Sequence, residues 1–211
     1  MRSVLTLLTA VMLGACSTQI STSSTSEMAW TSAYNVIMLD QVSGATLTLP
    51  DQPWLEDTVI NVIQQVSAKW KNPTPQSGQD RATFIARIAI NADRVKITVL
   101  DDLGRRALDI DWTENALDIT TADWVSGMVD GRRLLADMIM TYWPVDIVRS
   151  ALGTDLSISE TGNKRMIKTQ KDGDIFMQIN RPDGDPWQGQ ATLRNLALGY
   201  DLAINSRRMT P

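Results

Sequence analysis

Apolar and polar residues alternate most regularly in the middle of the chain. In residues 94–100 the apolar positions Val95, Ile97 and Val99 are separated by charged or hydroxyl residues. This period of two is typical of a strand with one buried and one solvated face. Neighbouring segments repeat the pattern, and turn-forming residues at 91–93 and 101–104 separate them. The pattern predicts an antiparallel meander of four strands: 83–90, 94–100, 105–112 and 116–120.

A helical period interrupts this meander. An apolar stripe at a spacing of about 3.6 residues is formed by Leu134, Leu135, Met138, Ile139 and Tyr142. Asp130 is placed to cap the helix at its start, and Trp143-Pro144 ends it. Pro144 also favours the start of a second short helix over residues 146–152, which Gly153 would stop.

Strand patterns resume after the helices. The predicted strands are 156–159, 165–170, 175–180, 191–195 and 199–205, with turns at 161–163 and 171–173. Earlier in the chain, residues 35–39 and 45–49 alternate weakly around a turn at Ser43-Gly44.

Residues 54–70 fit two patterns. A helix that Asp51 would cap suits the apolar residues Leu55, Val59, Val62, Ile63 and Val66, whereas residues 62–70 also suit a strand. We expect a short helix followed by a strand, with the change near Gln64.

This order of strands, helices and strands predicts an α+β protein that is mainly β. An antiparallel sheet that curls around helices on its concave face satisfies the order, because both element types then bury their apolar sides. The expected architecture is an incomplete β-barrel.

The first sixteen residues have the layout of an export signal. A cationic start at Met1-Arg2-Ser3 precedes a short apolar run and the sequence Leu13-Gly14-Ala15-Cys16. The run is too short to span a bilayer, which takes roughly 20 apolar residues. Leu-Gly-Ala-Cys resembles the bacterial lipobox, which implies that Cys16 receives lipid and becomes the mature N-terminus. The alternative is an incidental cysteine after an ordinary signal peptide.

This segment sets the expected organisation and location. Residues 1–15 form the signal peptide, 16–29 the lipidated cysteine with a flexible Ser/Thr tether, and 30–211 a single domain. Ser17 is compatible with export to the outer membrane, facing the periplasm; anchoring in the inner membrane stays open.

Composition narrows the chemistry. The chain has no histidine, a single cysteine and a net charge of −4. An acidic chain argues against nucleic acid as a partner. Without imidazole or a free thiol, His-based catalysis and the common zinc and copper sites are not expected. We predict no enzyme activity, no cofactor and no metal site.

Two acidic features are interpreted as structural. Asp109 and Asp111 share one strand face, and paired carboxylates serve acid–base catalysis or Ca²⁺ binding elsewhere. A solvated strand face also requires polar residues at alternate positions, which is the interpretation we favour. The Asp-Gly-Asp sequences at 172–174 and 183–185 resemble parts of calcium loops but favour simple turns.

Several short motifs together resemble a known family. They are the lipobox, Leu-Gly-Arg-Arg at 103–106, Leu-Leu-Ala-Asp at 134–137 with Trp143-Pro144, and Leu-Gly-Tyr-Asp-Leu at 198–202. They are similar to bacterial lipoproteins of undefined function whose genes often accompany aryl-polyene biosynthesis. The resemblance implies that residues 30–211 have the fold of the lipoprotein carriers LolA and LolB, in which helices form a lid over the sheet.

That fold implies an apolar cavity that takes a lipid, an acyl chain or a polyene-linked product. The candidate lining comes from inward strand faces and the predicted helix: Val95, Ile97, Val99, Leu108, Ile110, Trp112, Leu135, Met138, Ile139 and Tyr142. Each of these residues also suits ordinary core packing. The expected partners are the membrane, through the lipid anchor, and a hydrophobic ligand. The alternative function is a structural or assembly lipoprotein that binds an envelope protein.

Five of the seven tryptophans divide by position. Trp112, Trp124 and Trp143 lie around the helical interruption and favour core packing. Trp54 and Trp187 neighbour prolines, so we expect them in exposed loops that make contacts.

Overall fold

A ten-stranded antiparallel sheet dominates the computed structural model, which describes residues 35–72, 80–125 and 129–209. The strand order is β7-β6-β5-β4-β3-β12-β11-β10-β9-β8. The bounds are β3 (Ile60–Trp70), β4 (Arg81–Asn91), β5 (Arg94–Leu100), β6 (Arg106–Thr113), β7 (Ala116–Thr121), β8 (Leu156–Thr161), β9 (Lys164–Thr169), β10 (Ile175–Asn180), β11 (Gly189–Asn195) and β12 (Tyr200–Arg208). The predicted signal peptide, Cys16 and the tether lie outside the described residues.

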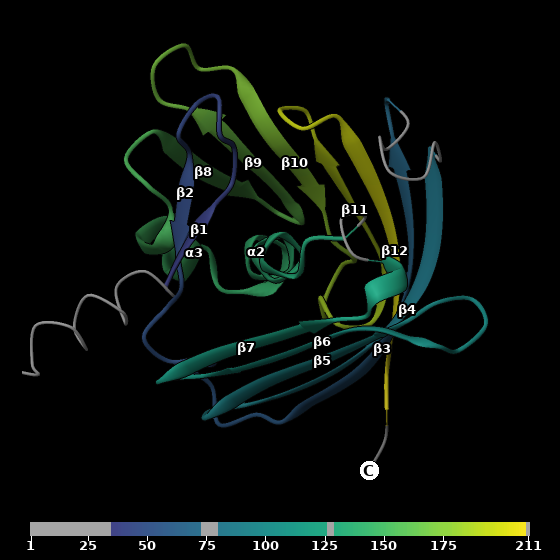
Figure 1. The fold of residues 1–211 in the computed structure, drawn as a ribbon. Helices are drawn as coiled ribbons and strands as arrows, with labels where there is room; N and C mark the ends of the chain where they lie inside the picture. Colours follow the sequence, from purple (N-terminus) through teal and green to yellow (C-terminus); the bar gives the residue numbers. More distant parts are fainter. Residues whose placement is uncertain (1–34, 73–79, 126–128, 210–211) are drawn as a thin grey trace, which may run out of the picture.

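The sheet curls into a half-barrel around one helix. Figure 1 looks along α2 (Gly131–Tyr142), which lies in the hollow of the sheet. Pairing of β3 with β12 joins the two meanders at the centre. Among the described residues the edge strands β7 and β8 do not pair with each other, so the sheet stays open. The predicted incomplete antiparallel barrel with a helix on its concave face is confirmed.

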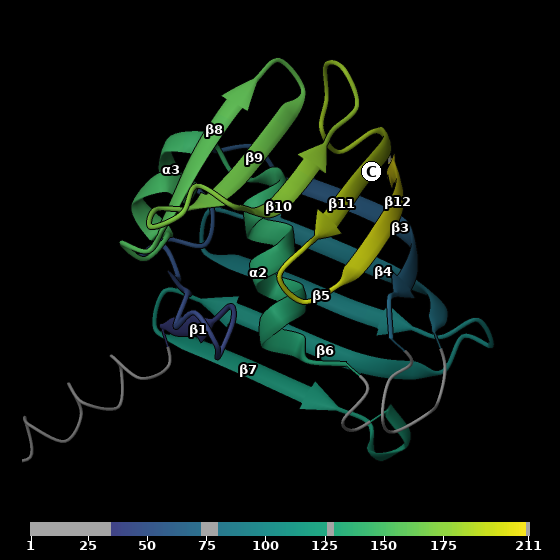
Figure 2. The same cartoon turned by 90° about the horizontal axis from the view of Figure 1, so that it is seen from above.

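A small hairpin and a second helix lie at the open side. β1 (Val36–Met38) pairs with β2 (Thr46–Thr48), and both lie beside α2 and α3 (Val145–Ala151) in Figures 1 and 2. The Gly153 N–H donates to the Thr46 carbonyl at 2.9 Å, and the Arg133 Nη2 donates to the Met38 carbonyl at 3.2 Å. These contacts fix the hairpin across the gap between the sheet edges.

The start of α2 forms as the sequence predicts. The Asp130 carboxylate accepts hydrogen bonds from the backbone N–H groups of Arg132, at 2.9 Å, and Arg133, at 3.3 Å. These bonds satisfy donors that the first helical turn leaves free. Gly131 follows the cap and lies against β6 and β7, where a Cβ would stand 2.6 Å from the Ile119 Cγ2 atom. The helix therefore enters the hollow close to the sheet.

The helix predicted before β3 is wrong. β3 begins at Ile60 and continues as a strand to Trp70, and the preceding residues 51–59 are irregular. Leu55 and Val59, which supported the helical spacing, are 53% and 60% exposed. Inward strand positions instead alternate from Ile60 through Gln64, so the buried polar Gln64 disguised a continuous strand.

The expectation of exposed tryptophans at positions 54 and 187 is also wrong. Both are buried, and with Trp143 they form edge-to-face contacts with ring centroids 5.0 to 6.3 Å apart. Trp112 stacks on Trp143, and the Trp143 indole N–H donates to the Pro53 carbonyl at 2.9 Å. Aromatic side chains from distant segments thus pack around the C-terminal end of α2 and replace part of a conventional aliphatic core.

Candidate ligand cavity

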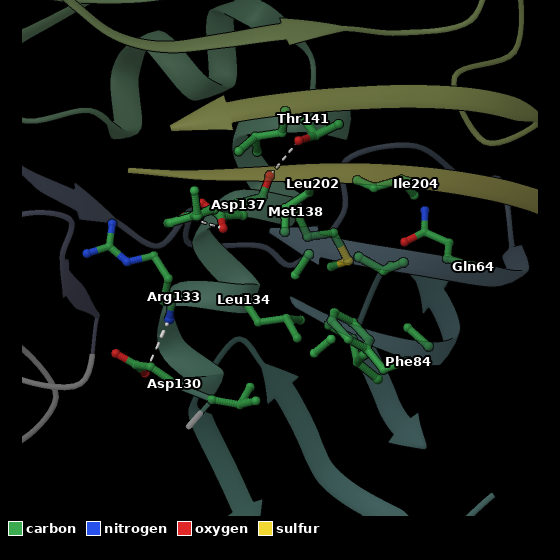
Figure 3. Close-up of a pocket in the computed structure, with 18 of the residues that line it drawn as sticks. Gln64, Phe84, Asp130, Arg133, Leu134, Asp137, Met138, Thr141, Leu202 and Ile204 are labelled. Carbon is green, nitrogen blue, oxygen red and sulfur yellow. Dashed lines mark hydrogen bonds between the residues drawn. The ribbon is translucent and has the colours of Figure 1, made fainter. Parts of the chain in front are cut away.

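A cavity of about 330 Å³ lies between α2 and the concave face of the sheet (Figure 3). Its volume is near the lower end of the range for small-molecule sites, ~300–1,000 Å³. Its walls come mainly from β3, β4, β12 and α2, and they are largely apolar. The lining side chains used below are Gln64, Ala68, Ala82, Phe84, Ala86, Arg133, Leu134, Asp137, Met138, Tyr142, Leu198, Tyr200, Leu202 and Ile204.

One face of α2 borders this cavity. The lining positions on and next to the helix are 130, 133, 134, 137, 138, 141 and 142, which follow the three- and four-residue spacing of a single helical face. On another face Leu135, Ile139 and Met140 are fully buried in the core. The helix therefore anchors itself with one side and leaves the other for the cavity.

Small side chains on the strands create the space. Ala68 on β3 is directly opposite Ala82 on β4, and Ala86 follows on the same inward face. Many inward positions elsewhere in the sheet carry Val, Ile or Leu, which fill the hollow. A methyl group reaches less far from the sheet than these side chains, so a void remains where alanines meet.

Part of the wall is a buried polar group. The Gln64 Nε2 donates to the Ser206 Oγ at 3.0 Å, and the Tyr142 hydroxyl lies 3.4 Å from the same oxygen. Burial raises the pKa of Tyr142, so its hydroxyl stays protonated near neutral pH. These neutral groups satisfy one another and leave the cavity uncharged at this place.

Asp137 is the buried carboxyl group of the cavity wall. It is 7% exposed, and its Oδ2 accepts a hydrogen bond from the Tyr200 hydroxyl at 2.6 Å. Its Oδ1 has no hydrogen-bond partner among the described residues. Burial raises the pKa of Asp137 to about 7, against the opposing effects of Tyr200 and Arg133.

The ten predicted lining residues fall into two groups. Ile97, Met138 and Tyr142 border the cavity. The others are buried in the hydrophobic core and are not among the residues that border it: Val95, Val99, Leu108, Ile110, Trp112, Leu135 and Ile139. Whether any of the ten contacts a ligand stays a prediction.

Most of the cavity wall lies on residues that the sequence did not single out. The missed positions are the inward alanines, Gln64, Asp137 and the apolar residues of β12. For the alanines, Gln64 and Asp137 the signal is a small or polar residue at an inward strand or helix position, where the pattern calls for a large apolar one. The apolar residues of β12 carry no such signal.

The acidic pair on β6 has ordinary partners. The Arg94 Nε donates to the Asp111 Oδ1 at 2.6 Å, and this bond holds the pKa of Asp111 below its usual range. Asp109 accepts a hydrogen bond from the Thr98 hydroxyl at 2.7 Å. Both carboxylates therefore form cross-strand contacts with β5 on the outer face of the sheet.

Two properties of the described part of the chain bear on function. No group of three or more Asp, Glu, His or Cys side chains there is arranged to hold a metal ion. Within the same residues no helix has the length and apolar character needed to cross a bilayer.

An open half-barrel with an internal helix and an apolar cavity is thus the class that the fold defines. The chain belongs to the family described as "Protein of unknown function (DUF3261)", whose model matches residues 61–208. No curated protein matches the chain.

Among solved structures, the chain is similar to a "putative outer membrane lipoprotein-sorting protein domain" from Vibrio parahaemolyticus. The TM-score is 0.30 at 8% identity, over 71% of this chain and 86% of that one. A likeness at this level carries no argument about function.

Proposed function

We propose that this protein is a lipid-anchored, non-enzymatic carrier or acceptor of a hydrophobic ligand in the bacterial envelope. The observation that supports it is the apolar cavity between α2 and the sheet. The ligand class is a lipid, an acyl chain or a polyene-linked product.

The exposure of the lining is what favours a ligand over simple packing. Phe84, Leu134 and Leu202 are only partly buried, and Leu198 is 40% exposed, although all four border the cavity. When a ligand covers apolar surface that was in contact with water, the free energy of binding becomes more favourable by roughly 25 cal/mol for each Å² covered. A protein that served only as a packed scaffold would gain stability by filling this space with larger side chains.

The anchor and the tether complete the proposal. A lipid on Cys16 would hold the domain at the membrane, and the Ser/Thr-rich residues 17–26 would let it reach a ligand in or near the bilayer. The outer membrane facing the periplasm is the proposed location. The link to aryl-polyene products rests on the family resemblance of the sequence alone.

The test is native mass spectrometry of gently purified protein. Residues 17–211, which keep every described residue, would be exported with a cleavable signal and analysed with extraction of any bound molecule. We expect a stoichiometric hydrophobic adduct, or binding of added acyl probes. A ligand-free mass that acyl probes and extracted envelope lipids leave unchanged would contradict the proposal and favour the partner-binding alternative.

A matched pair of variants locates the binding. Ala82→Trp places a large side chain in the cavity, whereas Ala89→Trp makes the same change on the exposed outer face of the same strand. Loss of the adduct in Ala82→Trp with retention in Ala89→Trp supports the cavity. Equal retention in both folded variants would place the ligand elsewhere.

A further inference from the structure

The wall of the cavity contains a hydrogen-bond acceptor that the protein itself does not satisfy. The Asp137 Oδ1 is buried and has no partner among the described residues, although the side chain borders a cavity that is otherwise mostly apolar. Buried polar atoms are almost always paired, so an unpaired carboxylate oxygen calls for an explanation.

Neighbouring residues hold this carboxyl group in place. The Asn195 side-chain amide donates to the Tyr200 hydroxyl at 3.1 Å. That hydroxyl therefore directs its own proton to the Asp137 Oδ2, which it reaches at 2.6 Å. Because Tyr200 has only one proton, it cannot serve Oδ1 as well.

The charged groups around Asp137 do not pair with it either. On α2 these are Arg133 and Asp130, one and two turns away, and from β12 the facing titratable group is Tyr200. The Arg133 Nη2 donates instead to the Met38 carbonyl on β1. Figure 3 shows the Arg133 guanidinium extending away from Phe84 and Leu134. The Oδ1 and the Arg133 Nη1 both stay buried without a hydrogen-bond partner among the described residues, so a donor that enters the cavity reaches Oδ1 once the lining side chains make room for it.

We infer that Asp137 recognises the polar head of the ligand, and that this ligand is a single-chain amphiphile whose head donates a hydrogen bond from a hydroxyl or amide N–H to the Asp137 Oδ1. The inference rests on the proposed function and narrows its ligand class. The chain of the amphiphile lies along Phe84, Leu134, Met138 and Ile204. The volume of about 330 Å³ suits one chain of moderate length rather than a lipid with several.

Two simple amides provide matched probes. Decanamide carries N–H donors, whereas N,N-dimethyldecanamide has the same acyl chain and carbonyl group but no donor. Binding of each to residues 17–211 would be measured by isothermal titration calorimetry at pH 8, where Asp137 is largely ionised. A hydrogen bond to a buried charged group leads us to expect about tenfold tighter binding of decanamide.

The substitution Asp137→Asn tests the atom that is responsible. Tyr200 still directs its proton to residue 137, so the Asn carbonyl takes that bond and the Asn NH₂ occupies the unpaired position. That position then donates instead of accepting, and the preference for decanamide is lost or reversed. Asn91→Asp, on the exposed end of β4, serves as a surface control and leaves the preference unchanged.

The pH dependence of amide binding provides a second measurement. A donor stabilises the ionised carboxylate, so the affinity for decanamide rises as the pH increases through 7, while that for the dimethyl amide does not. Equal affinities of the wild type for the two amides, or an unchanged preference in Asp137→Asn, would overturn this inference and leave the carrier function standing. Failure of both amides to bind would overturn this inference, and together with a ligand-free mass that envelope lipids leave unchanged it would overturn the carrier function as well.

Discussion

Replacing Asp137 by asparagine is expected to stabilise the protein at neutral pH and not at acidic pH. The carboxyl group is 7% exposed, and burial raises its pKa to about 7. Asparagine has nearly the same shape, keeps the bond from Tyr200 and carries no charge, so the comparison isolates the cost of ionising a buried carboxyl.

The sign and size follow from the two pKa values. An aspartate in the unfolded chain titrates near ~3.9. Between this value and about 7, the folded protein holds a proton that the unfolded chain has released. The free energy of unfolding therefore falls by ~1.4 kcal/mol for each pH unit, or about 4 kcal/mol in all, as the pH rises through this window.

Urea unfolding followed by tryptophan fluorescence measures this effect. The stability difference between Asp137→Asn and the wild type should grow by about 4 kcal/mol in favour of the variant between pH 4 and pH 8. Carboxylates whose pKa is lowered, such as Asp111 and Asp185, stabilise both proteins equally, and that contribution is lost in both at low pH. A difference that changes by less than about 1 kcal/mol over this range would refute the assigned protonation of Asp137.

Three further substitutions test the placement of α2, each by urea unfolding. Asp130→Ala removes the helix cap and should cost about 1 kcal/mol; no loss would mean that the cap bonds contribute nothing. Gly131→Ala places a Cβ 2.6 Å from the Ile119 Cγ2, and overpacking of roughly 1–3 kcal/mol should outweigh the gain in helix propensity; a stabilised variant would contradict this close contact. Trp143→Phe leaves the buried Pro53 carbonyl without its donor and should cost roughly 1–3 kcal/mol, whereas an unchanged stability would argue against that bond.

The sequence predicted the half-barrel because most strands expose one face. In β5, Val95, Ile97 and Val99 are buried between exposed or half-exposed neighbours, so the period of two is visible in the residues themselves. The α2 stripe and its Asp130 cap were equally visible. β3 was partly missed because Gln64 occupies an inward position, where the periodicity of a strand requires an apolar residue.

The sequence supported the expectation of an apolar cavity, but it did not identify most of the residues that line it. A search for large apolar side chains finds those that fill space, such as Leu108 and Ile110, which are 1% and 0% exposed in the core. A void arises where side chains are short, as at Ala82 and Ala86, and nothing in a single sequence says which alanines face one another. The burial of Trp54 was also beyond reach, because its contacts with Trp143 join segments far apart in the chain.

Photo-crosslinking shows whether the cavity holds the ligand, because it reports where a hydrophobic chain binds. A fatty amide with a diazirine near the end of its chain would be irradiated with residues 17–211, and the modified residues identified by peptide mass spectrometry. If the cavity holds the chain, adducts form on cavity residues such as Phe84, Leu134 and Leu202, and excess decanamide suppresses them. Adducts confined to exposed apolar residues such as Val42 and Leu103, with the cavity unmodified, would contradict binding in the cavity.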